Sequence, residues 1–370
     1  MTAGDEVGVP PRDDVAAMEG YHSPQLEVDV RLNTNEAPEA PPAAFVARAA
    51  ELVGAVRFNR YPDRAAGELR GRLGASHGVG VERVFCANGS NEVLQCLLLG
   101  YGGPGRSAAL FEPTYALHRH LAATTGTAVR TGERDGDWAI DLAEWDRLLA
   151  EGRAAGRHDP AITFVCSPNN PTGRLEPADR LAAILETAPG LVVVDEAYGQ
   201  FAPRSAIQLL GDHPRLVVVR TFSKTWSLAG LRLGYALAHP EVVAALEAVA
   251  LPYHLDALKQ AMGCLALEYE DEMVARVARL VTERRRLVDG LVAIGATVVP
   301  SDANFVLFSL PGGDGRALWK HLVDRSVLVR DVSSWPRLAG YLRVTVGTAG
   351  EDDAFLAAVA DFAAMASRSA

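Results

Sequence analysis

The sequence contains very little lysine. Of its 36 basic residues only Lys224, Lys259 and Lys320 are lysines, and arginine supplies the rest. Arginine serves as well as lysine in salt bridges, phosphate binding and solubility, so charge alone does not require these lysines. Arginine cannot lose its proton and attack a carbonyl carbon, whereas a lysine amine can do so and form a Schiff base. The few lysines are therefore candidates for chemistry that arginine does not perform.

Cysteine is also scarce, and long apolar runs are missing. Cys86, Cys96, Cys166 and Cys264 form no C-x-x-C pair, and we expect reduced thiols packed in the core of a cytoplasmic protein. No apolar run approaches the roughly 18 residues of a membrane span. The acidic N-terminus lacks the pattern of a signal peptide. The net charge of -10 argues against nucleic acid or an anionic membrane as a partner.

Short apolar runs alternate with helix-length segments through most of the first 250 residues. Their β-branched composition suits strands buried on both faces, and the alternation predicts an α/β fold with a mostly parallel sheet. The six runs are RVFCA (83–87), AALFE (108–112), ITFVC (162–166), LVVVD (191–195), LVVVR (216–220) and LGYAL (233–237).

The character of the sequence changes near residue 253. A long helical stretch over 256–293 is followed by strands and helices of a smaller α+β unit. We therefore predict three parts: a mobile N-terminal arm over 1–40, a large α/β domain over 41–252, and a small α+β domain over 253–370 that the arm joins.

Polar residues follow five of the predicted strands, where open α/β sheets bind their ligands. In the segment Asn88-Gly89-Ser90-Asn91, Gly89 permits a tight turn before a helix whose first N–H groups attract anions. Simple N-capping by Ser90 or Asn91 explains the same residues. Asp195 closes a very apolar strand, where a carboxylate needs a partner: a helix cap, a salt bridge or a buried cation.

Lys224 lies in an apolar segment that ill suits a surface lysine, and Arg232 follows it with Thr221 and Ser223 nearby. An arginine and two hydroxyls can bind a phosphate. One chemistry uses all of these groups together. A lysine forms an imine with an aldehyde cofactor, a carboxylate keeps the cofactor's pyridine nitrogen protonated, and a helix end, hydroxyls and an arginine bind its phosphate. That cofactor is pyridoxal 5'-phosphate.

The motifs SPNNPTG, VDEAY and TFSK…LAGLRLGY, in this order and spacing, resemble those of fold-type I pyridoxal-phosphate aminotransferases. With RLNTNEAP, RYPD, ANGSNEVLQ, LPYHL, SDANFVLF, VLVRDVSS and YLRVTVGT, the chain is similar to the histidinol-phosphate aminotransferase family from about Tyr21 to Phe362. The resemblance implies a large domain with a mostly parallel seven-stranded sheet, a homodimer, and transamination of L-histidinol phosphate with 2-oxoglutarate in histidine biosynthesis.

The resemblance also implies roles for individual residues. Lys224 would carry the covalent link to the cofactor, and Asp195 would pair with its pyridinium nitrogen. The other cofactor contacts would come from Tyr115 on the ring, from Tyr198 and Asn169 at the phenolic oxygen, and from Gly89, Ser90, Asn91, Thr221, Ser223 and Arg232 at the phosphate.

Further residues are implied at the partner subunit and the substrate. Tyr61 would reach the cofactor phosphate of the partner subunit. Arg343 would bind the substrate carboxylate, with Asn169 nearby, and Arg330 and Tyr21 would meet a distal phosphate. Without the surrounding motifs, Arg330 and Arg343 would be interpreted as surface ion-pair residues. No metal is expected.

Two features depart from the family pattern. Trp226 stands where Phe is expected, and we predict that it reshapes the wall near the reactive lysine. His118 and His120 are unusual, and we interpret them as a solvated helix face without a role.

Three alternatives remain at this stage. An aromatic amino acid aminotransferase would use the same scaffold, although Arg330 favours a phosphate over a phenyl ring. A decarboxylase of phosphorylated amino acids would keep the cofactor and change the reaction. A transcription regulator would need an added basic helix-turn-helix domain, which we do not expect because only about 20 acidic-leaning residues precede the family-like region.

Overall fold

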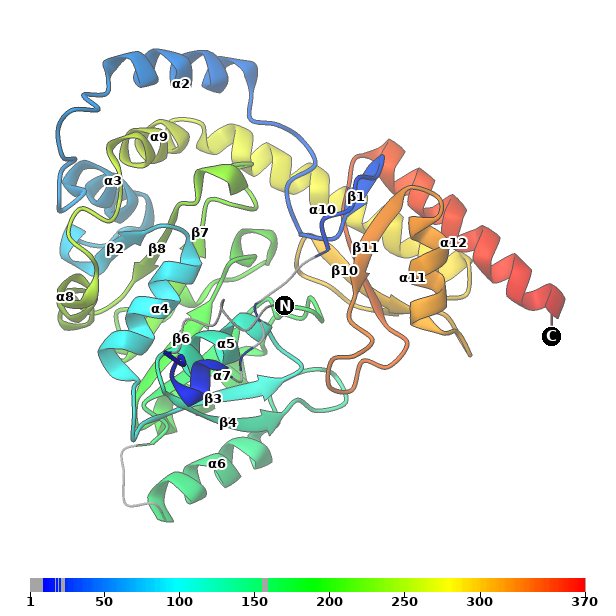
Figure 1. Cartoon of the computed structure of the whole chain (residues 1–370), viewed down its shortest axis with the longest axis horizontal. Helices are drawn as coiled ribbons and strands as arrows, with labels where there is room; N and C mark the ends of the chain where they lie inside the picture. Colours follow the sequence, from blue (N-terminus) through cyan, green and yellow to red (C-terminus); the bar gives the residue numbers. More distant parts are fainter. Residues whose placement is uncertain (1–8, 17, 19, 21–23, 155–158, 370) are drawn as a thin grey trace.

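The computed structural model describes residues 9–369 apart from 17, 19, 21–23 and 155–158. A seven-stranded sheet organises the larger part of the chain, in the order β2-β8-β7-β6-β5-β3-β4 (Figure 1). Its pairs are parallel except that β8 runs antiparallel to both of its neighbours. The predicted fold class is therefore confirmed. The strands are β2 (Val84–Ala87), β3 (Ser107–Glu112), β4 (Ala128–Glu133), β5 (Ile162–Cys166), β6 (Leu191–Asp195), β7 (Leu216–Thr221) and β8 (Gly234–Leu237).

The apolar runs correctly predict six of these strands and miss β4. β4 lies at the edge of the sheet, and most of its residues, AVRTGE, are partly or fully exposed. An edge strand with a half-polar sequence carries no continuous apolar run, so the pattern that marks the central strands does not extend to it.

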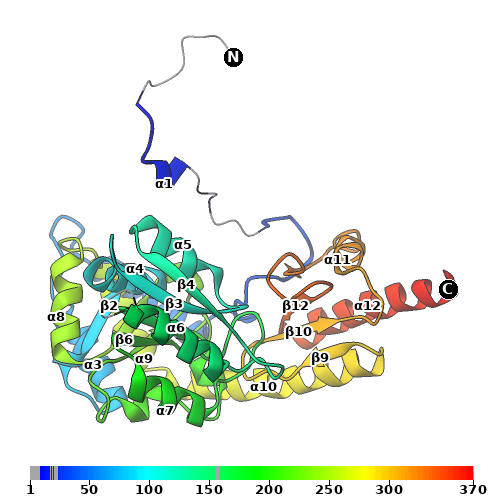
Figure 2. The same cartoon turned by 90° about the horizontal axis from the view of Figure 1, so that it is seen from below.

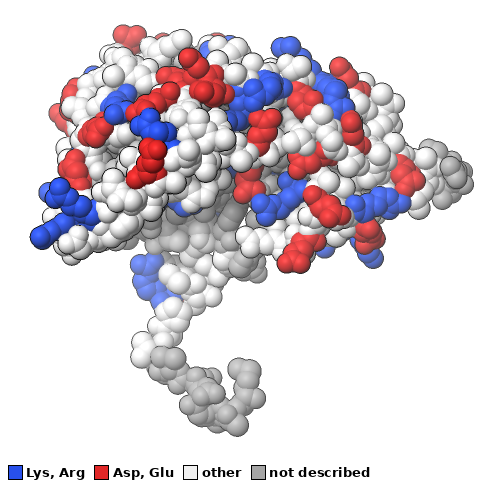
Figure 3. All heavy atoms as spheres, turned by 90° about the horizontal axis from the view of Figure 1, so that it is seen from above, with Lys and Arg blue, Asp and Glu red and all other residues white. Residues whose placement is uncertain are grey.

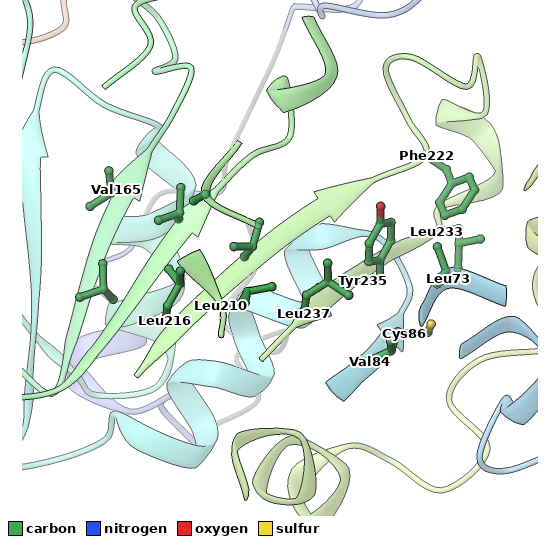
Figure 4. Packing of buried hydrophobic residues seen from close by; sticks show 14 of the residues in the cluster. Leu73, Val84, Cys86, Val165, Leu210, Leu216, Phe222, Leu233, Tyr235 and Leu237 are labelled. Atoms are coloured by element: carbon green, nitrogen blue, oxygen red, sulfur yellow. The ribbon is translucent and has the colours of Figure 1, made fainter. Parts of the chain in front are cut away.

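Helices cover both faces of this sheet. Because successive strand residues point to opposite faces, Val84 and Cys86 enter one core while Phe85 and Ala87 enter the other. The core drawn in Figure 4 also contains Phe222. That core is covered by α2 (Ala43–Ala55), α3 (Gly67–His77), α6 (Leu142–Ala154), α7 (Ala178–Thr187) and α9 (Ala257–Leu267), and the opposite core by α4 (Ser90–Tyr101), α5 (Ala116–Thr124) and α8 (Pro240–Val249).

A second sheet of five strands, in the order β1-β11-β12-β10-β9, organises the rest of the chain. β1 pairs in parallel with β11, so an N-terminal segment completes a sheet built from the C-terminal part. The three predicted domain ranges stay a prediction. The elements are β1 (Val30–Leu32), β9 (Thr297–Val299), β10 (Phe305–Ser309), β11 (Val327–Asp331), β12 (Leu342–Thr345), α10 (Glu270–Ala293), α11 (Gly315–Val323) and α12 (Ala349–Ser369).

The long helix predicted over 256–293 is divided into α9 and α10. The helical conformation is interrupted at Tyr269, whose φ of -112° is not helical. The Tyr269 ring packs edge-on against Phe45 of α2, with 5.6 Å between ring centroids. This packing contact explains a break for which the sequence offers neither Gly nor Pro. Figure 2 shows α10 running from the large sheet to the small one.

Short elements complete the description. They are α1 (Asp13–Ala16), η1 (Val81–Arg83), η2 (Gly199–Phe201), η3 (Ala206–Leu209) and η4 (Ala229–Leu231). On the face drawn in Figure 3, basic and acidic side chains are interspersed over the surface. Within the part of the chain that the structure describes, no helix combines the length and the apolar character of a bilayer span.

Candidate active site

A cavity of about 420 Å³ lies where the carboxyl ends of β5, β6 and β7 face the second sheet. Cys166, Asp195 and Thr221 end these three strands and all line it. The second sheet contributes Arg330 and Arg343. The predicted residues that line this cavity are Ser90, Asn91, Tyr115, Asp195, Tyr198, Thr221, Ser223, Lys224, Arg232, Arg330 and Arg343.

Lys224 lies in the turn after β7, and its Nζ donates a hydrogen bond to the carbonyl oxygen of Thr34 at 2.9 Å. Burial first, and then the cationic Arg343 and Arg232, lower the pKa of Lys224 to about 8 against the opposing effect of Glu36. Near neutral pH a useful fraction of the amine is therefore uncharged, the form that attacks a carbonyl or accepts a proton.

Asp195 ends β6 with its side chain 2% exposed. Its Oδ1 accepts a hydrogen bond from the backbone N–H of Ala197 at 3.1 Å, and its Oδ2 lies 3.0 Å from Nε2 of His118. The buried carboxylate thus has two protein partners while still lining the cavity. The bond from Ala197 is a turn contact and not a helix cap, and the pairing with a buried cation that the sequence left open stays a prediction.

The prediction that His118 belongs to a solvated helix face is wrong. The side chain is fully buried, its ring stacks on Phe164 with centroids 4.6 Å apart, and it meets the Tyr115 ring edge-on. α5 turns Leu117, His118 and Leu121 toward the sheet, whereas His120 is only half-buried. Two signals in the sequence pointed to this role: the three-residue spacing from Tyr115, and the need of Asp195 for a buried partner.

Glycine lets the start of α4 and Arg232 approach each other closely. Gly89 has a φ of +82°, and a Cβ there would lie 2.7 Å from Nη2 of Arg232. A Cβ on Gly234 would lie 2.3 Å from the backbone nitrogen of Ser90. Among the described residues, no side chain caps α4, so simple N-capping by Ser90 or Asn91 does not explain the motif. The first N–H groups of α4 remain available to an anion.

Hydroxyl groups extend this anion-binding corner. Nη1 of Arg232 donates to Oγ of Ser223 at 3.3 Å, and Oγ1 of Thr221 donates to the same oxygen at 2.9 Å. Arg232 itself has a φ of +55°, and its Nη1 also donates to the carbonyl oxygen of Ala229 at 3.2 Å. A helix start, an arginine and two hydroxyls together form a site of the size and charge that suit a phosphate.

Tyr198 lines the same cavity and is almost fully buried. Its hydroxyl accepts a hydrogen bond from Nδ2 of Asn35 at 2.9 Å, and Asn35 in turn accepts one from Oγ1 of Thr345. Burial raises the pKa of Tyr198 above its ordinary value. The phenol therefore keeps its proton and can donate it to an oxygen bound in the cavity.

The structure does not bring the predicted residue Asn169 to the cavity. Asn169 is fully buried, its Nδ2 donates to Pro113 and Thr172, and it does not line the cavity. Asn170 lines the cavity instead, and its Oδ1 accepts a hydrogen bond from Nη1 of Arg343 at 2.6 Å. The motif SPNNPTG carries two adjacent asparagines, and sequence alone does not show which of them faces inward.

The two arginines of the small sheet are register partners on neighbouring strands, β11 and β12. Arg343 is 5% exposed; its Nη2 donates to the carbonyl oxygen of Asn33 at 2.7 Å, and its guanidinium lies 5.1 Å from the centre of the Phe305 ring. These contacts fix the orientation of Arg343. Arg330 is less buried. The cavity can therefore receive two anionic groups of one molecule, or a carboxylate and a phosphate of two successive substrates.

Two other residues singled out from the sequence, Trp226 and Tyr61, lie outside the cavity. Trp226 packs in the core against Phe222, with ring centroids 5.3 Å apart, and does not line the cavity, so the prediction that it reshapes the wall near Lys224 is wrong. Tyr61 is 80% exposed and stacks on Tyr253, outside this cavity. Tyr21 lies outside the described residues.

Sequence reasoning also overlooked several lining residues. Thr34 and Glu36 come from the segment after β1, whose place beside Lys224 depends on the pairing of β1 with β11. Trp335 comes from the loop between β11 and β12, which has no motif of its own. No local pattern predicts these positions because each depends on contacts between distant parts of the chain.

Comparisons with known proteins agree with the family resemblance that the sequence motifs indicate. The model of the family "Aminotransferase class I and II" matches residues 27–359. Histidinol-phosphate aminotransferases of Streptomyces avermitilis and Frankia casuarinae are 48% and 46% identical to the chain, over 95% and 96% of its length and 96% and 90% of theirs. The fold is similar to that of histidinol-phosphate aminotransferase from Sinorhizobium meliloti in complex with pyridoxal-5'-phosphate (TM-score 0.85, 23% identity, 97% and 100% coverage). The chain therefore belongs to the family of class I and II aminotransferases.

Proposed function

We propose that this chain transfers the amino group of L-histidinol phosphate to 2-oxoglutarate, giving imidazole-acetol phosphate and L-glutamate in histidine biosynthesis. The observation that carries the proposal is a single cavity with Lys224 at the strand ends and Arg330 and Arg343 on the facing sheet. The relatives named histidinol-phosphate aminotransferase match nearly the whole chain and support the same substrate. The chain is an aminotransferase that uses pyridoxal phosphate, as predicted.

The residues present fit this cofactor. The cradle formed by Gly89, the start of α4 and Arg232 suits its phosphate, and a Cβ at position 89 would fill that space. Asp195 is a buried carboxylate suited to a protonated pyridine nitrogen, and Tyr198 and Asn170 are hydrogen-bonding groups for the phenolic oxygen. Lys224 supplies the amine that binds the aldehyde.

When bound, pyridoxal phosphate accepts the amino group of the substrate and stabilises negative charge at the substrate Cα. The chain's own residues then have distinct tasks. As a free amine, Nζ of Lys224 would accept the proton from the substrate Cα and return it to the cofactor carbon that carried the aldehyde. Its lowered pKa makes this possible near neutral pH. Arg343 orients a carboxylate, and Tyr198 donates its phenolic proton as a hydrogen bond.

His118 positions Asp195. The ring is held between Phe164 and Tyr115, so its Nε2 presents a fixed hydrogen-bond partner to Oδ2 of Asp195. We propose that the contact with His118 keeps Asp195 oriented toward the cofactor ring.

Arg330 is the residue that favours a phosphorylated substrate over an aromatic amino acid. It lines the cavity on the strand next to Arg343, so the cavity contains a second cation besides the one suited to a carboxylate. A phosphate gains charge-assisted hydrogen bonds from such a cation, whereas a phenyl ring offers it no hydrogen-bond acceptor.

We also propose a homodimer in the cytoplasm. Tyr61 and Tyr253 stack with 4.5 Å between centroids on the surface, and Phe58 and Leu251 beside them in sequence are more than 70% exposed. A surface group of large apolar residues of this kind is typical of a protein interface. Four buried free thiols suit a reducing compartment. Sedimentation equilibrium of the wild type and of Tyr61→Ala tests the dimer; a monomeric wild type would contradict it.

A half-reaction screen tests the substrate. Purified holoenzyme is mixed separately with L-histidinol phosphate, L-phenylalanine, L-tyrosine and L-glutamate, and the visible absorbance of the bound cofactor is followed. We expect rapid loss with L-histidinol phosphate and L-glutamate. Rapid loss with L-phenylalanine and none with L-histidinol phosphate would refute the proposed substrate and leave the aminotransferase assignment in place. Release of carbon dioxide would instead indicate a decarboxylase.

A further inference from the structure

The loop that carries Trp335 is tied to the large sheet through Arg337. This loop, residues 332–341, joins β11 to β12, and the Arg337 side chain reaches the segment that follows β4. We propose that Arg337 and Trp138 form a clasp that positions Trp335 and Arg330 for the substrate. The proposal rests on the proposed function, because it takes Arg330 as the cation that meets an anionic group of the substrate.

The clasp combines hydrogen bonds with a ring contact. Nη1 of Arg337 donates to the carbonyl oxygen of Arg134, and Nη2 donates to that of Asp135 at 3.2 Å. The guanidinium also lies 5.1 Å from the centre of the Trp138 ring. Arg337 and Trp138 have φ values of +62° and +65°, which are uncommon for residues with a Cβ and persist only where surrounding contacts hold them.

The ring side of the clasp belongs to a small core that both sheets share. Trp138 comes from the large-sheet side of this core, whereas Trp335 and Tyr341 come from the loop. The Trp138 ring meets the Tyr341 ring edge-on, with 6.4 Å between centroids. The buried residues of this core are Val299, Leu307, Val332 and Leu338. Trp335 therefore packs in the same core as Trp138 while it also lines the cavity.

The large-sheet end of the clasp is itself anchored. Arg134 is 2% exposed, and its Nη1 donates to the carbonyl oxygen of Trp138 at 3.0 Å and to Oε2 of Glu176 at 2.9 Å. The backbone N–H of Glu176 donates in turn to Oγ of Ser167, the residue after β5. Hydrogen bonds thus connect the clasp to the end of a strand that reaches the cavity, so the loop is held against a fixed support.

Cofactor binding and substrate binding should respond differently to the clasp. Lys224 and Asp195, which the proposed function assigns to the cofactor, follow or end strands of the large sheet and have no contact with the loop among the described residues. Arg330 lies in β11 just before the loop, Trp335 lies within it, and both line the cavity. Loosening the clasp should therefore weaken substrate binding and leave cofactor binding intact.

The test compares Arg337→Met with Arg316→Met in the reaction of the holoenzyme with L-histidinol phosphate. The Arg316 guanidinium lies 4.7 Å from the centre of the Trp319 ring, and both residues belong to α11, so this matched contact does not connect the two sheets. For Arg337→Met we expect KM to rise about fivefold, with kcat and cofactor affinity within about twofold of the wild type. The visible spectrum of the bound cofactor should not change, and Arg316→Met should leave all four quantities unaltered.

Two further variants separate the parts of the clasp. Arg337→Lys keeps a cation near the Trp138 ring but lacks the planar fork, so it should restore only part of the loss. Trp138→Leu should also raise KM, and combining it with Arg337→Met should add little, because both changes break the same clasp. If Trp138→Leu does not fold, the two Arg337 variants decide the proposal alone.

Three results would overturn the proposal. An unchanged KM in Arg337→Met would show that the loop keeps its place without the clasp. A loss of cofactor affinity as large as the rise in KM would show a general structural role, and an equal rise in KM for Arg316→Met would show that a connection between the sheets is not needed. If the wild type does not react with L-histidinol phosphate, the proposed substrate fails separately, and the same comparison with an amino acid that it accepts decides the role of the clasp.

Discussion

The two walls of the cavity are built in different ways. On the wall formed by the large sheet, Asp195 and Thr221 end buried strands and are almost inaccessible to solvent. On the wall formed by the small sheet, Arg330 and Trp335 are partly exposed, and Trp335 lies on a loop. The first wall offers fixed groups for one chemistry, while the second offers positions that can change without disturbing the sheet. We therefore propose that reaction type depends on the first wall, and substrate choice on the second.

Lys224→Arg should have the largest effect. Arginine keeps the charge but not the reactive amine, so we expect turnover to fall by at least about 10⁴-fold and the covalent attachment of the cofactor to be lost. Borohydride reduction of the holoenzyme followed by peptide mass analysis measures the attachment. Lys259→Arg is the control, because Lys259 pairs with Asp256 on the surface and should retain full activity. A reduced label on any residue other than Lys224 would contradict the assignment.

Asp195→Asn should have the second largest effect on turnover. The amide keeps the shape and can still accept from Ala197, but it removes the charge beside the cofactor ring. We expect turnover to fall about 10² to 10³-fold with measurable cofactor binding retained. Single-turnover kinetics with L-glutamate separate the chemical step from binding. A rate equal to that of the wild type would remove Asp195 from the mechanism.

His118→Phe should have a smaller effect, because it acts through Asp195. Phenylalanine keeps the stacking on Phe164 and removes the contact of 3.0 Å with Oδ2. We expect about a tenfold loss of turnover and weaker cofactor binding, with a changed visible absorption spectrum of the bound cofactor. His120→Phe, on the same helix but only half-buried, is the control. An unchanged spectrum in His118→Phe would leave His118 with a packing role alone.

The pH dependence of cofactor capture should be the mildest effect. Because the pKa of Lys224 is lowered to about 8, its uncharged fraction rises about tenfold between pH 7 and pH 9 and then levels off. The rate at which the cofactor-free protein binds pyridoxal phosphate covalently should follow this curve in stopped-flow absorbance. A free lysine derivative, with the ordinary pKa, should continue to accelerate above pH 9. A protein rate that also kept rising would show that burial does not lower the pKa of Lys224.

Local sequence patterns predicted cavity residues on both walls. Asp195 ends an apolar strand and Lys224 follows another by three residues on the large sheet, and Arg330 and Arg343 lie on strands of the small sheet. The strand β4 and the break at Tyr269 were missed because edge exposure and packing against Phe45, and not local composition, decide them. The sequence also did not predict which residue of a turn faces the cavity.

The errors at His118, Asn169 and Trp226 have a common physical origin. Each residue sits beside a correctly located motif, and its orientation depends on the element packed against it. His118 turns inward because α5 lies on the sheet, and Trp226 turns toward the core beside Phe222. Asn169 and Asn170 exchange the expected roles within one turn. Rotations of this kind depend on three-dimensional packing that a single sequence does not specify.

The pairing of β1 with β11 has a consequence for how the enzyme matures. The backbone N–H of Asn35 bonds to Oγ1 of Thr345, 310 residues further along, and the carbonyl oxygen of Thr34 holds the amine of Lys224. During synthesis the early segment must wait for β11 and β12 to emerge from the ribosome, and closing so long a loop is slow. A nascent chain that ends before Val327 can form the large sheet yet has no partner for β1. Catalytic competence should therefore arise only at the close of translation.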